Sequence, residues 1–176
     1  MFNIDKMRIF EDNQLRLRIE KASSVELICI LYEEILSRLL KARILLKSRK
    51  LPSISMDDII EETKKIESIV ECEDSCNLSE VLERARTLSD EIEILRQYTK
   101  LLNSVIQIIS GLKSVMANSD ENDEITSGLN FAYDYCVACV GDILEEKDEG
   151  KFDQVIHVLK TIKGAWDDVA KQYVKS

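Results

Sequence analysis

The sequence predicts an all-α protein, a four-helix bundle with an additional inserted helix. Two observations support this fold class. Apolar residues recur at alternating steps of three and four positions in five segments, which is the period of amphipathic helices. The 176 residues include one Pro and five Gly, and they are rich in Leu, Ile, Glu, Lys and Arg, a composition typical of helical proteins. This length fits a single domain over residues 1–176 with a sizeable core.

The first predicted helix covers residues 23–47. Ser23 or Ser24 can cap its start, and Glu26 lies three positions beyond Ser23 in a capping-box arrangement. Two apolar stripes run along this helix, and so wide an apolar arc is typical of a helix with more than one neighbour. The first stripe contains Ile28, Tyr32, Ile35, Leu39, Ala42 and Leu46, and the second contains Leu27, Leu31, Leu36, Leu40 and Ile44.

Pro52 ends this helix, and a short helix over 56–72 and a long one over 79–116 follow. The apolar face of the short helix needs cover, which we expect from the N-terminal part of the long helix. Residues 51–100 contain six Lys/Arg and thirteen Asp/Glu, a net charge of −7, whereas the rest of the chain sums to −2. We therefore interpret 48–95 as an acidic inserted helical region within the same domain.

Two further helices complete the pattern. The first ends near Gly150, a residue type suited to a helix terminus. Four helices are enough for a bundle, so the short helix over 56–72 is the addition. The last two apolar seams are Ile125, Leu129, Ala132, Cys136, Val140 and Ile143, and then Phe152, Val155 or Ile156, Leu159, Ile162, Trp166, Val169 and Tyr173.

The net charge of the chain limits the classes of partner that it can bind. A net charge of −9 argues against a nucleic acid, because binding a polyanion requires a basic face. Charged residues interrupt every apolar stretch well short of the length that spans a bilayer, and the N-terminus has no apolar region of a signal peptide. We expect a cytoplasmic protein without membrane insertion.

No constellation for catalysis or metal binding is evident. Cys136 and Cys139 form a CxxC in the middle of a predicted helix, where cysteine behaves as a small apolar residue, so we interpret them as structural. A di-iron site needs a Glu-x-x-His motif on each of two helices, and this chain has a single histidine, His157. We expect no enzymatic activity, no metal and no cofactor.

Three stretches together resemble one known family. Residues 19–36, "IEKASSVELICILYEEIL", resemble the opening of the flagellin-export chaperones, the FliS family. Residues 123–136, "DEITSGLNFAYDYC", and 152–169, "FDQVIHVLKTIKGAWDDV", are similar to two later helices of that family. The chain departs from the family where Ala138 and Cys139 replace two arginines, and in the length of 48–95.

The resemblance implies an antiparallel four-helix bundle that acts in the cytoplasm without a cofactor. It implies that the protein binds the disordered C-terminal segment of flagellin in apolar grooves, prevents premature polymerisation and presents the client to the flagellar export apparatus. Helix-in-groove recognition would explain the second apolar stripe of the first helix. The residues that we expect to contact the client flank the matching motifs: Ile19, Leu27, Leu31, Tyr32, Leu129 and Tyr133.

A second function remains open: a homodimeric helical adaptor without a flagellin client. The N-terminal segment 1–18, which we expect to be partly flexible, would then fill the groove, and its apolar residues suit such a plug: Phe2, Ile4, Met7, Ile9 and Phe10. A small metal- or redox-linked bundle is the third and weakest reading, because only the cysteines favour it.

Overall fold

The structure is a computed structural model that describes residues 14–47, 56–71, 78–116 and 124–173. All elements in these ranges are helices, which confirms the all-α prediction. A short helix covers 14–21. It is followed by α2 (Ser24–Lys47), α3 (Met56–Glu71), α4 (Leu78–Met116), α5 (Glu124–Glu146) and α6 (Glu149–Tyr173).

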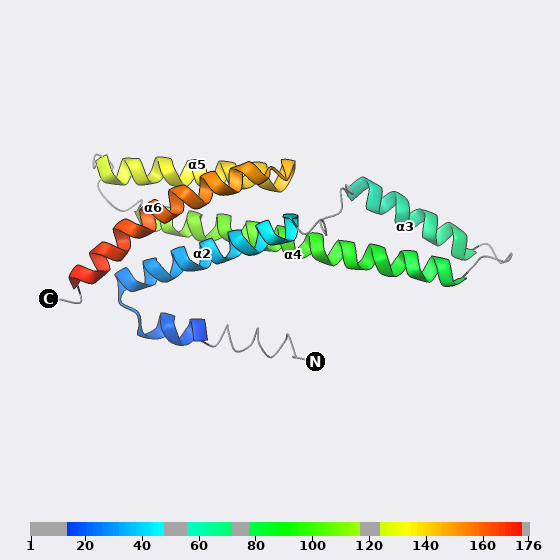
Figure 1. Cartoon of the computed structure of the whole chain (residues 1–176), viewed down its shortest axis with the longest axis horizontal. Coiled ribbons are helices and arrows are strands. Elements are labelled where there is room, and N and C mark those ends of the chain that lie inside the picture. Colours follow the sequence, from blue (N-terminus) through cyan, green and yellow to red (C-terminus); the bar gives the residue numbers. More distant parts are fainter. Residues whose placement is uncertain (1–13, 48–55, 72–77, 117–123, 174–176) are drawn as a thin grey trace.

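Four of these helices form an antiparallel bundle (Figure 1). α2 packs against α4 and α6, and α5 packs against the same two helices, so the four form a closed ring in which α2 and α5 lie on a diagonal. α2, α4, α5 and α6 run in alternating directions along the bundle axis. This is the up-down-up-down topology that short connections favour.

The core of the bundle comes from the apolar stripes of the four helices. Tyr32, Ile35, Leu39 and Ala42 of α2 are fully buried, which confirms the first stripe as the core-facing one. α5 and α6 bury residues of the predicted seams, including Cys136 and Phe152. α4 contributes only its C-terminal half, through Tyr98, Leu102, Val105, Ile109 and Leu112.

α3 and the N-terminal half of α4 form a hairpin that extends beyond the bundle (Figure 1). α3 packs along α4, as the sequence predicts for the short helix. None of the helices in the described ranges combines the length and the apolar composition that a membrane-spanning helix requires.

Two local expectations differ from the structure. Residues 14–21 are helical, although no helix was predicted there, whereas 1–13 and the proposed plug residues lie outside the described part. The connection between α5 and α6 turns at Lys147, with a φ of 55°, and not at Gly150, which is already the second residue of α6. The amide of Lys147 donates to the carbonyl of Ile143 at 3.1 Å, which satisfies one of the last carbonyls of α5.

Candidate functional site

The start of α2 is fixed by the predicted capping box. The backbone amide of Ser23 donates to the Glu26 carboxylate at 2.8 Å, and the Glu26 amide donates to the Ser23 hydroxyl at 3.3 Å. These hydrogen bonds from Ser23, first from its backbone and then from its side chain, lower the pKa of Glu26. Two amides that lack partners within the helix are thereby satisfied, and α2 begins at Ser24.

The second apolar stripe of α2 is divided by the first. At 100° per residue, Leu27 and Leu31 lie on one flank of the buried stripe, Leu40 lies beyond the other flank, and Ile44 lies on the face opposite the stripe. Leu27 and Leu31 are half-buried, whereas Leu40 is exposed and Ile44 retains 65% of its accessible surface. The prediction of one continuous second stripe is therefore wrong: α2 presents two separate apolar margins to its surroundings.

Tyr32 of α2 and Tyr133 of α5 meet inside the bundle. Both side chains are buried, and their hydroxyls form a hydrogen bond across the diagonal. Burial, followed by the hydrogen bond to Tyr133, raises the pKa of Tyr32, and burial also raises that of Tyr133. Both phenols therefore remain protonated, and the pair acts as a structural contact between two helices that lie opposite each other in the ring.

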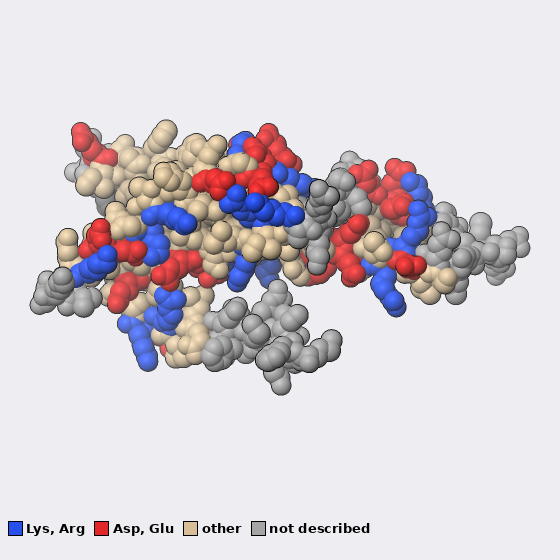
Figure 2. All heavy atoms as spheres, viewed as in Figure 1, with Lys and Arg blue, Asp and Glu red and all other residues tan. Residues whose placement is uncertain are grey.

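α5 exposes large apolar residues. Phe131 retains 76% of its accessible surface and Tyr135 is also exposed, both outside the core-facing positions of the helix. Ile125, which the sequence predicts as the first residue of the core seam, retains 72% of its accessible surface at the start of α5, so the prediction is wrong for this residue. Val115, at the end of α4, is exposed as well. Figure 2 shows few charged side chains over most of α5 on the face in view. Solvent-facing aromatic and branched residues on one helix are typical of a surface that contacts another polypeptide.

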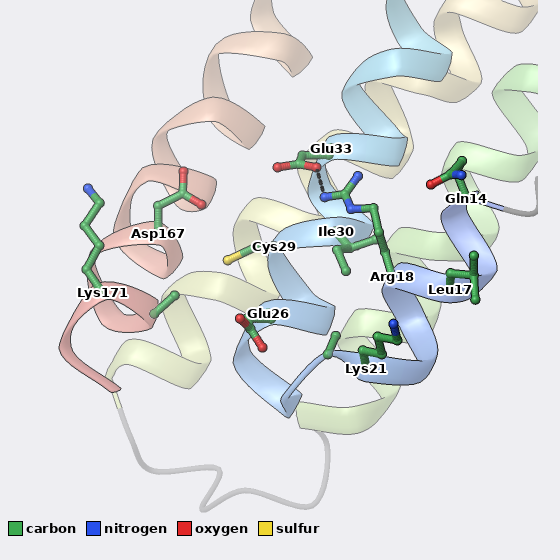
Figure 3. Close-up of a pocket in the computed structure, with 12 residues that line it drawn as sticks. Gln14, Leu17, Arg18, Lys21, Glu26, Cys29, Ile30, Glu33, Asp167 and Lys171 are labelled. Atoms are coloured by element: carbon green, nitrogen blue, oxygen red, sulfur yellow. Dashed lines mark hydrogen bonds and ion pairs between the residues drawn. The ribbon is translucent and has the colours of Figure 1, made fainter. Parts of the chain in front are cut away.

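A cavity of about 690 Å³ lies where the helix over 14–21, the start of α2 and the end of α6 come together (Figure 3). Arg18 and Glu33, which both line it, form an ion pair of 2.7 Å. Glu33 also lies 3.7 Å from Lys163 of α6, which binds Asp167 at 2.8 Å. This chain of charges connects the helix over 14–21, α2 and α6.

The cysteines within the described ranges are suited to packing and not to nucleophilic or metal chemistry. Burial is the main cause that raises the pKa of the Cys136 thiol to about 12. Burial also raises the pKa of the Cys29 thiol, and the neighbouring Asp167 raises it further. A protonated thiol is a poor nucleophile and a poor metal ligand. Within the ranges that the structure covers, no group of His, Cys, Asp or Glu side chains converges on a common point. Cys72 and Cys76 lie outside those ranges.

Comparison with known proteins decides the family. The family model described as "Flagellar protein FliS" matches residues 76–173, more than half of the 176-residue chain. The chain belongs to the FliS family. The "Flagellar secretion chaperone FliS" of Vibrio cholerae serotype O1 (strain ATCC 39315 / El Tor Inaba N16961) is 31% identical over 72 residues, which cover 41% of this chain. The aligned part spans 52% of that curated relative, about half its length. No solved structure matches this chain significantly.

The FliS match covers α4, α5 and α6 and leaves α2 outside. The resemblance of residues 19–36 to the opening of the FliS family therefore stays a prediction. Residues 76–95 lie inside the match although the sequence analysis assigned them to the inserted region. The match gives no support for an insertion beyond residue 75, and the upper boundary of the insert stays a prediction too.

The structure places the six predicted client-binding residues in different environments. Ile19 is exposed, Leu27 is half-buried, and Leu31 and Leu129 are half-buried against the core. Tyr32 and Tyr133 are brought together in the interior. Two exposed residues that the sequence analysis did not assign to the site, Phe131 and Ile44, lie on the same helices as these positions. The sequence feature that could have identified both residues is their apolar character at positions outside the core-facing stripes of α5 and α2.

Proposed function

We propose that this protein is a cytoplasmic flagellar secretion chaperone. It binds the disordered C-terminal segment of flagellin, prevents premature polymerisation and presents the client to the export apparatus. Membership of the FliS family supports the role, and the Vibrio cholerae relative is named a flagellar secretion chaperone. We propose no enzymatic activity and no cofactor.

The observation that carries this proposal is the apolar surface that the bundle leaves uncovered. Phe131 and Ile125 on α5, and Leu40 and Ile44 on α2, do not contribute to the core, yet they expose large apolar side chains. A client segment that folds as an amphipathic helix needs such a surface for its own apolar face. Burial of these side chains offsets the conformational entropy that the client loses when it becomes ordered.

The predicted site residues take two roles in this proposal. Ile19, Leu27, Leu31 and Leu129 border the exposed margins and contact the client directly. Tyr32 and Tyr133 are fully or almost fully buried, so their contribution is to hold α2 and α5 in the positions that present those margins.

The N-terminal segment competes with the client for the α2 surface. Support comes from the helix over 14–21, which lines the cavity against α2 and α6 and is joined to α2 by the Arg18–Glu33 ion pair. Removal of residues 1–14 should therefore tighten client binding, because a self-occluded groove is competent for only part of the time. Unchanged or weaker binding after truncation would contradict this competition without touching the chaperone role.

Calorimetric titration with a synthetic peptide of the cognate flagellin C-terminal segment tests the function. We expect binding with a clearly negative heat capacity change, since coupled folding and binding buries a large apolar area. The double variant Ile125→Ser, Phe131→Ser should weaken binding about tenfold or more through the loss of that area.

Leu82→Ser is the matched control, because Leu82 is similarly exposed at 60% but lies in the α3/α4 hairpin. This control should bind the peptide like the unchanged protein. Absence of heat and of complex with both full-length and truncated protein would reject the chaperone proposal. A stable homodimer under the same conditions would then favour the adaptor function.

A further inference from the structure

The α3/α4 hairpin forms a separate surface from the bundle. α3 makes its main helix contacts with α4 alone, and the hairpin extends past the end of the bundle (Figure 1). The hairpin is formed by other residues than those proposed to contact flagellin, so its properties do not depend on that role.

The apolar residues of the hairpin are incompletely covered. Only Ile59 and Val81 are buried among its described side chains. Ile66, Leu88 and Ile92 are half-buried. Two helices alone cannot enclose an apolar seam, because each leaves the outer sides of the contact open to water. The hairpin therefore offers a surface on which a third helix can pack.

One side of this seam is hollowed into a groove of about 390 Å³ between α3 and α4. Ile66 and Leu88 supply apolar side chains to its lining, and Thr87 adds a polar group. Three carboxylates also line it, Glu62 from α3 and Glu83 and Glu91 from α4. Arg84 is the basic residue among the lining side chains, and it lies 3.8 Å from Glu62, at the outer limit of an ion pair.

Charge indicates which kind of helix fits this groove. Residues 51–100 carry a net charge of −7, and Figure 2 shows carboxylates over α3 and the adjoining part of α4, with lysine and arginine side chains between them. A second copy of the hairpin would bring two such surfaces together, which like-charge repulsion opposes. A helix with lysines and arginines beside its apolar stripe would instead place cations at Glu62, Glu83 and Glu91.

We propose that the α3/α4 groove is a docking site for a basic amphipathic helix of a partner protein. The apolar residues of that helix, spaced by three and four, pack on Ile66 and Leu88. Its flanking lysines or arginines pair with the three glutamates of the rim. The flagellin-binding margins of α2 and α5 are formed by other residues, so both polypeptides can be held at once.

The test uses the full chain and a designed 18-residue peptide of leucine and lysine in helical spacing, with a second peptide in which glutamate replaces lysine. Binding is measured by calorimetry, and the site is mapped by amide chemical-shift changes. The groove variant Glu62→Gln, Glu83→Gln, Glu91→Gln removes the rim charges. The matched control Glu20→Gln, Glu124→Gln, Glu145→Gln makes the same change in net charge with exposed residues away from the hairpin.

We expect the lysine peptide to shift the amides of Ile66, Thr87 and Leu88, and the groove variant to bind it about fivefold to tenfold more weakly. The control variant and the full chain should bind alike, and the glutamate peptide should not bind. Equal weakening in both variants would overturn the proposal, because it would indicate attraction to overall charge. Shift changes confined to the bundle, or a homodimer that only the groove variant dissociates, would overturn it as well.

Discussion

The hydroxyls of Tyr32 and Tyr133 connect two helices that are not neighbours in the ring. Each hydroxyl lies in the interior, where an unpaired polar group costs considerably more than the paired group contributes. The pair therefore restricts how α2 and α5 can slide past each other, because any shift that separates the hydroxyls leaves at least one of them without this partner.

Removing one hydroxyl should reveal this coupling. We expect Tyr133→Phe to lower the free energy of unfolding by about 1–2 kcal/mol, since the hydrogen bond between the two buried hydroxyls is lost. The double variant Tyr32→Phe, Tyr133→Phe should cost less than the sum of the single changes by about 1 kcal/mol. Urea unfolding of the three variants measures this difference, and strict additivity would show that the hydroxyls do not interact.

Among the described residues, Lys147 is the non-glycine residue whose backbone adopts the left-handed conformation. A side chain with a β-carbon is strained at this φ, whereas glycine is not. Lys147→Gly should therefore raise the free energy of unfolding by about 0.5–1 kcal/mol. Lys147→Ala is the control, because alanine keeps the β-carbon and should give little or none of that gain in thermal or urea unfolding.

At the scale of single elements, the start of α2 shows how one side chain can make a helix end sensitive to pH. Glu26 accepts stronger hydrogen bonds from Ser23 while it is ionised, and its pKa is lowered from the ordinary 4.5. Its contribution to stability is therefore present above pH 4.5 and is lost as the pH falls through the lowered pKa of the folded state.

Glu26→Gln should lower the melting temperature near neutral pH, because the amide is a weaker acceptor than the carboxylate. The difference from the unchanged protein should shrink at pH values well below 4.5, where Glu26 is protonated in both states. Glu20→Gln serves as the control outside the capping box. A difference that stays constant across this range would contradict the role of the charged form.

Helices with a clear apolar period and a cap were predictable from the sequence, and less regular ones were not. Ser23 and Glu26 set the start of α2 correctly because their hydrogen bonds are local. The helix over 14–21 was missed because Leu15, Leu17 and Ile19 alternate, a pattern of period two that does not indicate a helix. The helix in fact lies against α2 through contacts such as Arg18–Glu33, which no local pattern reveals.

The candidate site shows the same division. The apolar character of Leu31 and Leu129 did not decide whether these residues face the core or the surface. The neighbour that covers each residue comes from another helix, which a local pattern does not specify. The contact between Tyr32 and Tyr133 joins residues 101 positions apart, and a single sequence does not specify such pairs. Exposure of Phe131 and Ile44 became evident only once the ring of helices was known.

At the scale of the whole molecule, the bundle should fold without the hairpin. The buried residues of α4 in the bundle begin at Tyr98, and the hairpin buries only Ile59 and Val81 among its described side chains. Replacement of residues 51–93 by a short Gly/Ser linker should therefore leave one cooperative unfolding transition. The fluorescence of Trp166, the single tryptophan, reports on the bundle because its side chain packs against the core. A gradual, non-cooperative change would show that the bundle depends on the hairpin.

α4 belongs to both the bundle and the hairpin without interruption. Its 39 residues correspond to roughly 58 Å of continuous helix at about 1.5 Å per residue. A continuous helix transmits orientation as well as distance, because it cannot bend sharply without a break in its hydrogen bonds. A protein bound at the hairpin would therefore keep a fixed distance and a fixed orientation to a polypeptide bound at the bundle. The length of α4 would set that distance.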